Sequence, residues 1–371
     1  MARAPFLLDD GVVFLNHGSF GACPEPVFAE YQGWQRELER EPVAFLARRL
    51  NGLLEDVRAQ LGAYVGADPE GLVLLPNATA GVNVAARSLE LRPGDEVLST
   101  DHEYGAMRFV WQDACERADA TWVEQPVGIP AGDVVEEVWS GVTPRTRVLF
   151  LSHITSPTAI RFPVEELCRR AREAGILSVV DGAHAPGQLD LDLEALGADV
   201  YTGNCHKWLC APKGSGFLWA RSELRDLLRP HVISWGAPSE RFTERHASHG
   251  TVDPAAYLAV PAAIAFHREH LAPARADCHA LLAEFMPLLG APVAASFEQM
   301  ASVELPSCDA ADVRRRLWQE HRIEVVADEW NGRPLLRVSV QVYNTRDDLQ
   351  TLAEALTEAL GQSPRGIVPT R

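Results

Sequence analysis

The sequence predicts an α/β fold with a mostly parallel sheet and helices on both faces, followed by a smaller α+β domain. Three observations support this prediction. Short apolar runs alternate with helical segments along most of the chain, several of these runs end directly in polar residues, and the length of 371 residues is enough for two domains. The sequence turns polar at residues 241–250, and we expect the second domain to begin at residue 251.

The first half of the chain alternates helices and strands. Apolar residues at helical spacing predict a helix over residues 26–64, with a break at Pro42. Apolar runs bounded by turn residues predict buried strands, which further helices connect. The expected strands are 72–75, 96–99, 121–124 and 147–152, and the expected helices are 78–89, 104–118 and 163–174. Pro163 at its first position and Gly175 after its end delimit the last of these helices.

The second half continues this pattern and then changes. Strands are expected at residues 176–180, 200–202 and 217–220, and a bridging helix at 254–270 leads into the C-terminal domain. Two further strands are expected there, at residues 301–305 and 335–343, before a helix with one leucine stripe. A capping box of Thr345 and Asp348 begins this last helix, and Gly361 ends it.

Charge and cysteine content exclude several classes of function. The formal net charge of −17 repels phosphate backbones and anionic membrane surfaces, so neither nucleic acid nor a membrane is an expected partner. The seven cysteines are odd in number and never spaced as metal-ligand pairs, which predicts a reduced, cytoplasmic protein without a bound metal. No apolar run approaches the ~20 residues of a membrane span, and the N-terminus lacks the long apolar segment of a signal peptide.

The chain contains only two lysines, Lys207 and Lys213, while Arg supplies the other 32 of its 34 basic residues. Both residue types solvate a surface, but only Lys has a primary amine that can lose its proton and form a Schiff base. Lys207 lies between His206 and Trp208, an apolar setting that lowers the pKa of an amine, whereas Lys213 lies in a glycine-containing loop. Lys207 is therefore the candidate nucleophile. A coding bias against lysine is the alternative explanation.

Polar residues follow three of the predicted strands, at the edge of the sheet where their carboxyl ends meet. After the first strand, the helix that begins at Ala78 offers backbone N–H groups to a phosphate, with Asn77 and Thr79 as side-chain donors. The alternative is that Asn77 only caps this helix. After the second strand, Asp181 ends an apolar run, where a carboxylate is poorly solvated and needs a partner. That partner is either a protonated ring nitrogen of a bound molecule or the N–H groups of a local turn. The third strand is followed by Asn204, Cys205, His206 and Lys207.

Five motifs are spread over most of the chain. Two are highly specific: Val180-Asp181-Gly182-Ala183-His184-Ala185-Pro186-Gly187 and His206-Lys207-Trp208-Leu209. The others are Phe14-Leu15-Asn16-His17-Gly18-Ser19-Phe20-Gly21, Asn77-Ala78-Thr79 and Asp101-His102-Glu103-Tyr104. Together they resemble pyridoxal 5'-phosphate (PLP) enzymes of fold type I, in the class V aminotransferase superfamily and its isopenicillin N epimerase-like branch. The resemblance implies a seven-stranded large domain at residues 21–250, an N-terminal arm at 1–20 beside the active site and a small domain at 251–371.

The resemblance also assigns roles to single residues. Lys207 would form the Schiff base with the cofactor and then move the Cα proton, while Asp181 would keep the ring nitrogen protonated so that the ring accepts electrons. His184 would hydrogen-bond the phenolic oxygen of the cofactor. Thr251 would reach the phosphate in the neighbouring subunit, which implies a homodimer with the active site at its interface. The phosphate would be held by Ala78, Thr79, Asn204 and His206.

Further assignments concern the face of the cofactor ring and the substrate. A residue that stacks on the ring is expected between Asp101 and Tyr104, with Tyr104 as the choice and His102 as its rival. Arg337 resembles the arginine that clamps a substrate carboxylate, and it lies on the polar side of an alternating strand, where a solvated Arg is the alternative. Asn16 and His17 are candidates to line the substrate mouth, unless His17 only takes part in a turn.

The expected function is a PLP-dependent enzyme that acts at the Cα of an amino-acid substrate, epimerase-like and in specialised metabolism. The alternatives are a β-eliminating C–S lyase on a cysteine conjugate, an aminotransferase, and a non-catalytic PLP-fold binding protein. Sulfur transfer through a persulfide is disfavoured because residues 321–336, ahead of Arg337, contain no cysteine. A dehydrogenase is disfavoured because the GxGxxG fingerprint is absent after the first strand.

Overall fold

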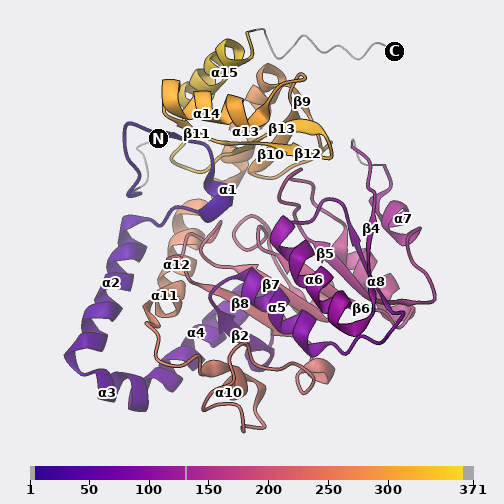
Figure 1. Ribbon diagram of the computed structural model, residues 1–371. Coiled ribbons are helices and arrows are strands. Elements are labelled where there is room, and N and C mark those ends of the chain that lie inside the picture. The colour runs from indigo at the N-terminus through magenta and orange to yellow at the C-terminus, as the bar shows by residue number, and fades with distance from the viewer. Residues whose placement is uncertain (1–4, 130–131, 362–371) are drawn as a thin grey trace.

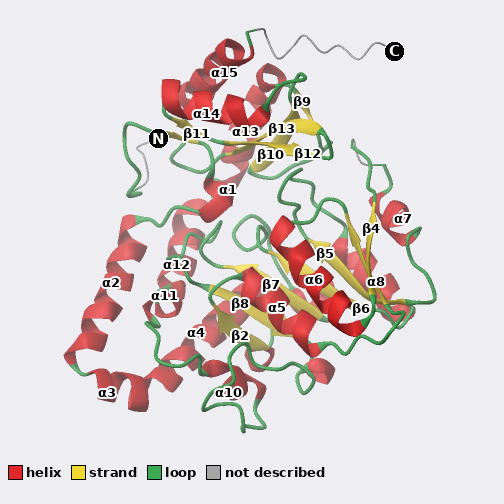
Figure 2. Ribbon diagram, viewed as in Figure 1, coloured by secondary structure: helices red, strands yellow, loops and turns green. Residues whose placement is uncertain are grey.

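The structure, a computed structural model, describes residues 5–129 and 132–361, and the strands of these residues form three sheets (Figures 1 and 2). The largest has seven strands in the order β2-β8-β7-β6-β5-β3-β4. Within it, only β8 runs antiparallel to its neighbours, β7 and β2. These strands are β2 (Leu72–Leu75), β3 (Glu96–Thr100), β4 (Thr121–Gln125), β5 (Thr146–Ser152), β6 (Leu177–Gly182), β7 (Val200–Asn204) and β8 (Gly216–Ala220).

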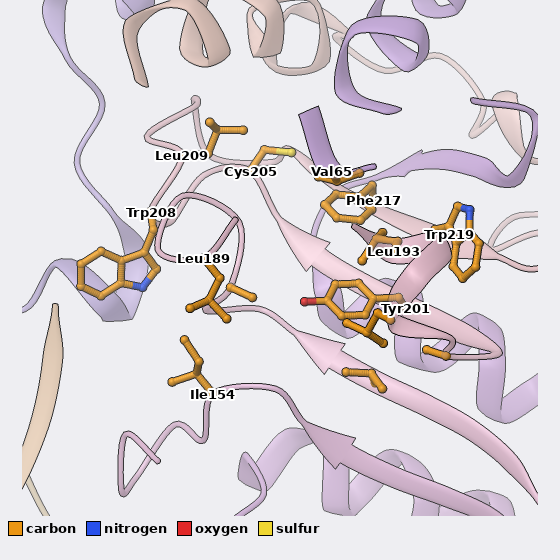
Figure 3. Packing of buried hydrophobic residues seen from close by; sticks show 14 of the residues in the cluster. Val65, Ile154, Leu189, Leu193, Tyr201, Cys205, Trp208, Leu209, Phe217 and Trp219 are labelled. Atoms are coloured by element: carbon orange, nitrogen blue, oxygen red, sulfur yellow. The ribbon is translucent and has the colours of Figure 1, made fainter. Parts of the chain in front are cut away.

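Helices cover both faces of this sheet because the apolar side chains of each strand point alternately to one face and the other. Val73 and Leu75 of β2 belong to the apolar cluster beneath α5 (Ala78–Ser88) and α6 (Gly105–Ala118). Leu72 and Leu74 belong to the cluster on the opposite face. Figure 3 shows part of that second cluster, where Tyr201, Phe217 and Trp219 project from β7 and β8. Its helices are α4 (Leu50–Val65), α8 (Val164–Glu173) and α9 (Leu193–Leu196), and α7 (Val134–Trp139) packs beside α8.

A second, antiparallel sheet forms the C-terminal part of the fold, with its own apolar core. Its strands, in spatial order, are β12 (Val326–Trp330), β13 (Arg333–Ser339), β10 (Met300–Glu304) and β9 (Ala291–Pro292). The helices α13 (Arg275–Leu289), α14 (Ala310–His321) and α15 (Arg346–Leu360) supply the rest of this core. Figure 1 shows these elements above the large sheet.

The N-terminal segment connects the two parts. Its strand β1 (Val13–Phe14) pairs in parallel with β11 (Ile323–Glu324), and α1 (His17–Phe20) follows directly. In Figure 1, α1 lies between the C-terminal elements and the large sheet. The proposed domain boundaries at residues 20 and 250 stay predictions, and residues 1–4 and 362–371 of the outer ranges lie outside the described residues.

Several predicted elements differ in the structure for identifiable reasons. The helix expected over 26–64 is divided, at the predicted Pro42, into α2 (Glu25–Arg40), α3 (Pro42–Ala44), a π-turn and α4. The expected bridging helix is also divided, into α11 (Ala255–Leu258) and α12 (Val260–Phe266), because Pro261 has no N–H to continue the first. A π-helix (His267–Leu271) continues α12 to the predicted end. The short helix α10 (Phe242–Ala247) precedes them. Strand β13 ends at Ser339 and not at the predicted residue 343. The N–H of Ser339 donates to the carbonyl oxygen of Leu15 in the N-terminal segment.

Candidate active site

Lys207 and Asp181 line one small cavity at the carboxyl end of the large sheet. Tyr104, Ser152, Ile154, Ser156, Ala183 and His184 complete its lining. Asp181 belongs to β6 and Ser152 is the last residue of β5, while Lys207 lies three residues beyond the end of β7. Two of the three strand ends that the sequence analysis singled out, those at Asp181 and Lys207, therefore meet at this cavity, as expected for a parallel sheet.

The amine of Lys207 lies against a histidine whose hydrogen-bonding pattern is set by a tryptophan. Nζ of Lys207 is 3.3 Å from Nε2 of His184, and the indole N–H of Trp208 donates to Nδ1 of His184 at 3.3 Å. Because an indole nitrogen only donates, Nδ1 must accept, and Nε2 of the neutral ring carries the hydrogen. Burial holds the pKa of His184 well below its ordinary value, so the ring stays neutral.

Charge and burial tune Lys207 for chemistry near neutral pH. Burial, followed by the positive charge of Arg337, lowers the pKa of Lys207 to about 8, while the negative charge of Asp181 opposes this shift. Asp181 is itself only 4% exposed, and burial raises its pKa although the N–H of Ala183 donates to its Oδ1 at 2.9 Å. The carboxyl group of Asp181 therefore makes a local turn hydrogen bond with Ala183 and also interacts with the positive charge of Lys207.

The N-terminal segment holds the main chain on which Lys207 sits. The ring of His17 is fully buried, with Nε2 3.1 Å from the carbonyl oxygen of Lys207 and Nδ1 2.8 Å from the hydroxyl of Tyr343. A Cβ at Gly21 would lie 2.1 Å from the carbonyl oxygen of His206, and the φ of Gly21 is +68°. Lys213 donates from Nζ to the Gly21 carbonyl at 3.0 Å. Lys213 therefore supports this segment and does not line the cavity.

Arg337 is buried and is aimed by two serines. Its NH1 donates to the carbonyl and hydroxyl oxygens of Ser156 at 2.6 and 3.0 Å, and its NH2 donates to Ser19 Oγ at 3.0 Å. Ser19 in turn donates to Asn16, whose Nδ2 donates to Glu324 at 3.0 Å. Arg337 is 5% exposed and burial lowers its pKa to about 10. The alternative of a solvated strand arginine does not describe this environment, and its buried Nε has no protein partner among the described residues.

The helix start expected to hold a phosphate is partly occupied by the protein's own acceptors. Asn204 Oδ1 accepts from the N–H of Ala78 at 2.8 Å, and Asn77 Oδ1 accepts from the N–H of Ala80 at 2.9 Å. Asn77 is thus the N-cap of α5, whose first turn contains Thr79. His206 donates from Nδ1 to the Ser215 carbonyl at 2.9 Å, and burial lowers its pKa to about 4.

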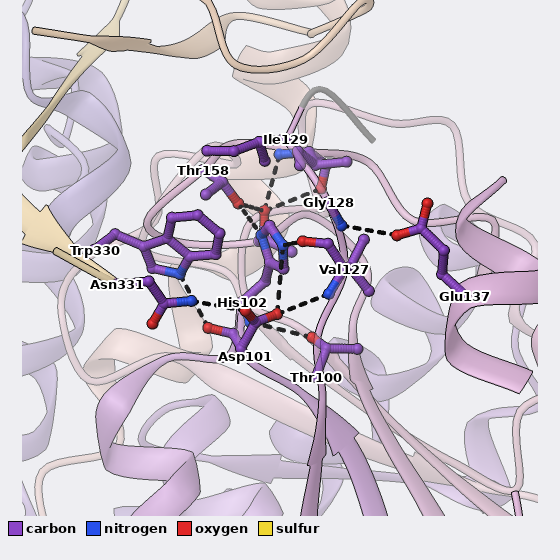
Figure 4. A network of polar contacts seen from close by, with 12 residues as sticks. Thr100, Asp101, His102, Val127, Gly128, Ile129, Glu137, Thr158, Trp330 and Asn331 are labelled. Atoms are coloured by element: carbon purple, nitrogen blue, oxygen red, sulfur yellow. Dashed lines mark hydrogen bonds and ion pairs between the residues drawn. The ribbon is translucent and has the colours of Figure 1, made fainter. Parts of the chain in front are cut away.

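The two candidates for stacking on the ring lie in different environments. Tyr104 is the N-cap residue of α6, is 51% exposed and lines the cavity of Lys207. His102 is fully buried, with Nδ1 2.7 Å from Thr158 Oγ1 and Nε2 2.9 Å from the Val127 carbonyl (Figure 4). Its ring lies 4.5 Å from that of Trp330. The geometry favours Tyr104, because Tyr104 borders the cavity of Lys207, whereas the fully buried His102 does not.

Thr251 lies apart from this cavity. It is exposed and lines a larger pocket with Arg58, Trp235 and His249, none of which borders the cavity of Lys207. Within one chain the structure does not bring Thr251 to the cofactor residues. A role of Thr251 in binding the cofactor phosphate requires a second subunit.

Comparisons with known proteins place the chain in a family. The sequence profile of the family described as aminotransferase class-V matches residues 25–352. The chain belongs to this family. This class-V chain is 40% identical over 390 residues to the isopenicillin N epimerase of Amycolatopsis lactamdurans, covering 96% of the chain and 97% of the relative. It is 30% identical to a putative L-cysteine desulfhydrase of Oryza sativa subsp. japonica, covering 94% of the chain and 83% of the relative.

A solved structure of another protein shares the fold. A cystine C–S lyase, determined in complex with its product cysteine persulfide, has a TM-score of 0.85 at 22% identity, with 94% of this chain and 98% of that chain covered. The predicted membership in the class V superfamily and the predicted fold type I architecture are confirmed. The chain is a PLP-dependent enzyme, as the sequence analysis expected.

The residues that line this cavity fit the cofactor PLP. The cavity places a primary amine, a buried carboxyl group and a neutral histidine together, which suits an aldehyde, a protonated ring nitrogen and a phenolic oxygen. The unpartnered buried Nε of Arg337 shows that this cation has donor capacity left for an anion. Among the described residues, the only grouping with metal-ligand spacing is a cluster of two glutamates and a histidine at Glu320, His321 and Glu358, distant in sequence from the site.

Sequence reasoning missed several features of this site. The bond from Trp208 to His184, the bonds from Arg337 to Ser19 and Ser156, and the burial of Glu103 were not predicted. Ser19 and Glu103 do lie inside motifs that the sequence analysis quoted, so their positions carried a signal. The partners Arg337 of Ser19 and Ser152 of Glu103 are far away in the sequence and could not be read from it. No helix of the described residues is long and apolar enough to cross a membrane.

Proposed function

We propose that this enzyme is an epimerase, which inverts the configuration at Cα of an amino-acid substrate. The observation that carries the proposal is the 40% identity, over nearly the whole chain, to an isopenicillin N epimerase. The site agrees with it, because Lys207 and Asp181 line one cavity and the buried Arg337 is close enough for its positive charge to act on Lys207. Isopenicillin N or a related carboxylate-bearing amino acid is therefore the proposed substrate, in specialised metabolism.

Each proposed role follows from the surroundings of the residue. Lys207 would bind the cofactor aldehyde and move the Cα proton, since a pKa of about 8 leaves its amine partly neutral at physiological pH. Arg337 would bind the substrate carboxylate, because its guanidinium is aimed by Ser19 and Ser156 and not neutralised by a carboxylate among the described residues. When bound, the cofactor supplies an electron sink for the pair of electrons left at Cα.

Other residues would hold the cofactor. Asp181 would keep the ring nitrogen protonated, His184 would donate from Nε2 to the phenolic oxygen, and Tyr104 would stack on the ring. The phosphate would lie at the start of α5, near Thr79 and His206. His206 donates from Nδ1 to the protein, so its Nε2 can reach the phosphate as a donor only when protonated, which the phosphate charge favours.

We also propose a homodimer and a cytoplasmic location. Thr251 and the nearby Trp235, which is 94% exposed, lie on a surface that a second copy would cover, and Thr251 would then reach the phosphate in that copy. The seven cysteines, all within the described residues, are free thiols, which supports a reducing compartment. A strictly monomeric active enzyme in sedimentation would contradict the shared site.

The test is NMR of the PLP-loaded enzyme in deuterated buffer with free amino acids, cysteine conjugates and isopenicillin N. Deuterium at Cα of a retained substrate, with both configurations found by chiral analysis, is the expected result. A second candidate is a C–S lyase, favoured by the 30% identity to a putative L-cysteine desulfhydrase. Release of pyruvate and ammonia from a cysteine substrate would establish it instead. A keto acid and an aminated cofactor would identify an aminotransferase.

A further inference from the structure

Glu103 is a buried carboxyl group that the proposed reaction does not use. It is 4% exposed, and each of its oxygens lies within hydrogen-bond distance of a hydroxyl group, Oε1 at 2.9 Å from Thr100 Oγ1 and Oε2 at 2.5 Å from Ser152 Oγ. Within residues 5–129 and 132–361, no arginine or lysine forms an ion pair with it, and the charged group acting on it is another carboxylate, Asp181. An ionised carboxylate buried without a cation is costly, so the group favours its protonated form.

Burial changes the pKa of Glu103 more than its hydrogen bonds with the two hydroxyl groups do. It raises the pKa of Glu103 to about 8, with the negative charge of Asp181 adding to the shift and the hydrogen bonds with Ser152 and Thr100 opposing it. At neutral pH the acid form therefore predominates. A protonated carboxyl group has one hydrogen to donate, and the partner that receives it can be identified from the neighbouring bonds.

The proton of Glu103 belongs on the side of Ser152. Thr100 Oγ1 accepts the N–H of His102 at 3.2 Å and donates its hydroxyl hydrogen to Oε1 of Glu103 at 2.9 Å. Oε2 then remains as the oxygen that carries the proton, and its distance to Ser152 is the shorter of the two. With Ser152 as acceptor from Glu103, the hydroxyl hydrogen of Ser152 is free for another partner.

Ser152 and Asp181 are aligned partners on β5 and β6, so their side chains point to the same side of the sheet. Both line the cavity of Lys207. We propose that Glu103 is a proton-bearing positioning residue: it donates to Ser152 and so frees the hydroxyl hydrogen of Ser152 for Asp181. Among the described residues no side-chain hydrogen bond joins Ser152 and Asp181, so a side-chain rotation has to bring the two together. The Ser152 hydroxyl then stabilises the negative charge of Asp181, which keeps the proton on the ring nitrogen of the bound cofactor. The proposal holds for any reaction at this site but rests on the proposed pairing of Asp181 with the ring.

Infrared spectroscopy of the intact holoenzyme tests the protonation. The spectrum of the wild type minus that of Glu103→Gln should contain a protonated carboxylic acid band at pH 6 to 7, which is lost as the pH passes about 8. A carboxylate band in place of the acid band at pH 6 to 7 would overturn the proposal. This measurement does not depend on the role of Asp181 or on the reaction.

Nitrogen-15 NMR with ring-labelled PLP tests the consequence. Glu103→Gln should keep the pyridinium resonance, because a neutral amide donates to Ser152 and accepts from Thr100 as the acid does. Ser152→Ala and Glu103→Ala should both shift the resonance toward that of an unprotonated ring. Equal resonances in the wild type and Ser152→Ala would overturn the role of Ser152, even if Glu103→Ala fails to fold. An unchanged resonance in Asp181→Asn would instead refute the pairing of Asp181 with the ring, and so separates the two proposals.

Discussion

The imidazole of His17 binds the backbone carbonyl of Lys207 at 3.1 Å, across 190 residues of sequence. Since a carbonyl oxygen only accepts, Nε2 of His17 carries the hydrogen and Nδ1 accepts from the Tyr343 hydroxyl at 2.8 Å. Burial lowers the pKa of His17 to about 3, so this arrangement persists throughout the physiological pH range. His17 therefore positions the main chain of the Lys207 turn from the N-terminal segment.

Replacing His17 should destabilise the protein. His17→Ala leaves the Lys207 carbonyl and the Tyr343 hydroxyl unpaired in a buried place, and we expect a loss of about 1–3 kcal/mol in the free energy of unfolding. Tyr343→Phe, which removes only the hydroxyl, is the matched control and should cost less. Urea unfolding of the holoenzyme measures both losses. Equal stability of His17→Ala and the wild type would refute the positioning role.

The two lysines should differ completely in their bond to the cofactor. Lys207→Ala should abolish borohydride trapping of PLP, because Lys207 lines the cavity. Lys213→Ala is the matched control and should retain trapping, since its amine donates to the Gly21 carbonyl. Mass spectrometry of the reduced protein detects the label. Labelling of Lys213 in the Lys207→Ala variant would contradict the assignment of Lys207 as the Schiff-base lysine.

Removing Arg337 should impair substrate binding selectively. Hydrogen bonds to charged groups contribute about 1.5–3 kcal/mol, so Arg337→Ala should raise KM about tenfold to a hundredfold while the affinity for PLP is kept. Ser156→Ala, which removes one hydroxyl partner of the guanidinium, should have a smaller effect of the same sign. Steady-state kinetics with a carboxylate substrate measures both effects. An unchanged KM in Arg337→Ala would show that Arg337 does not bind the substrate carboxylate.

The rate of cofactor loading should follow the titration of Lys207. Only the neutral amine attacks the aldehyde, so the rate at which apo-protein binds PLP should rise about tenfold per pH unit and level off near the pKa of about 8. Arg337→Met should raise this midpoint because it removes a positive neighbour, and Asp181→Asn should lower it. Stopped-flow absorbance gives the profile. Identical midpoints in all three proteins would contradict this electrostatic account.

The buried acid Glu103 should make stability depend on pH. Its pKa is raised from 4.5 to about 8 in the folded state, so the folded protein holds a proton that the unfolded chain releases between these values. Stability from this group is complete below pH 4.5 and is lost as the pH rises to about 8, by up to ~1.4 kcal/mol per pH unit. Glu103→Gln lacks this loss, and denaturant unfolding across the pH range compares the two. A constant difference would mean that Glu103 is not buried as an acid.

Local patterns in the sequence were sufficient for most of the large sheet. The apolar run Leu72–Leu75 and the strand that ends in Asp181 appear as β2 and β6, because a short run of buried apolar residues carries its own signal. The capping box of Thr345 and Asp348 appears at the start of α15 for the same reason. Where a proline lies inside an expected helix, as Pro261 does, the structure divides the helix within the predicted bounds.

Residue types and motifs also determined the chemistry of the site. The scarcity of lysine singled out Lys207 as the candidate nucleophile, and the five motifs that resemble the class V superfamily indicated the cofactor. Such inferences need only the identity of a residue and its near neighbours along the chain. The choice of Tyr104 over His102 needed more, because both lie in the same motif and differ only in what surrounds them.

Only the tertiary structure decided the partners of these residues. Ser156 lies 181 residues from Arg337, and Ser152 lies 49 residues from Glu103, yet each pair shares a hydrogen bond. The protonation of Glu103 and the pKa of Lys207 depend on burial and on charges contributed by separate strands, which no window of sequence contains. The sequence by itself determined which groups are present, and the packing of distant segments decided their charge, their orientation and therefore their use.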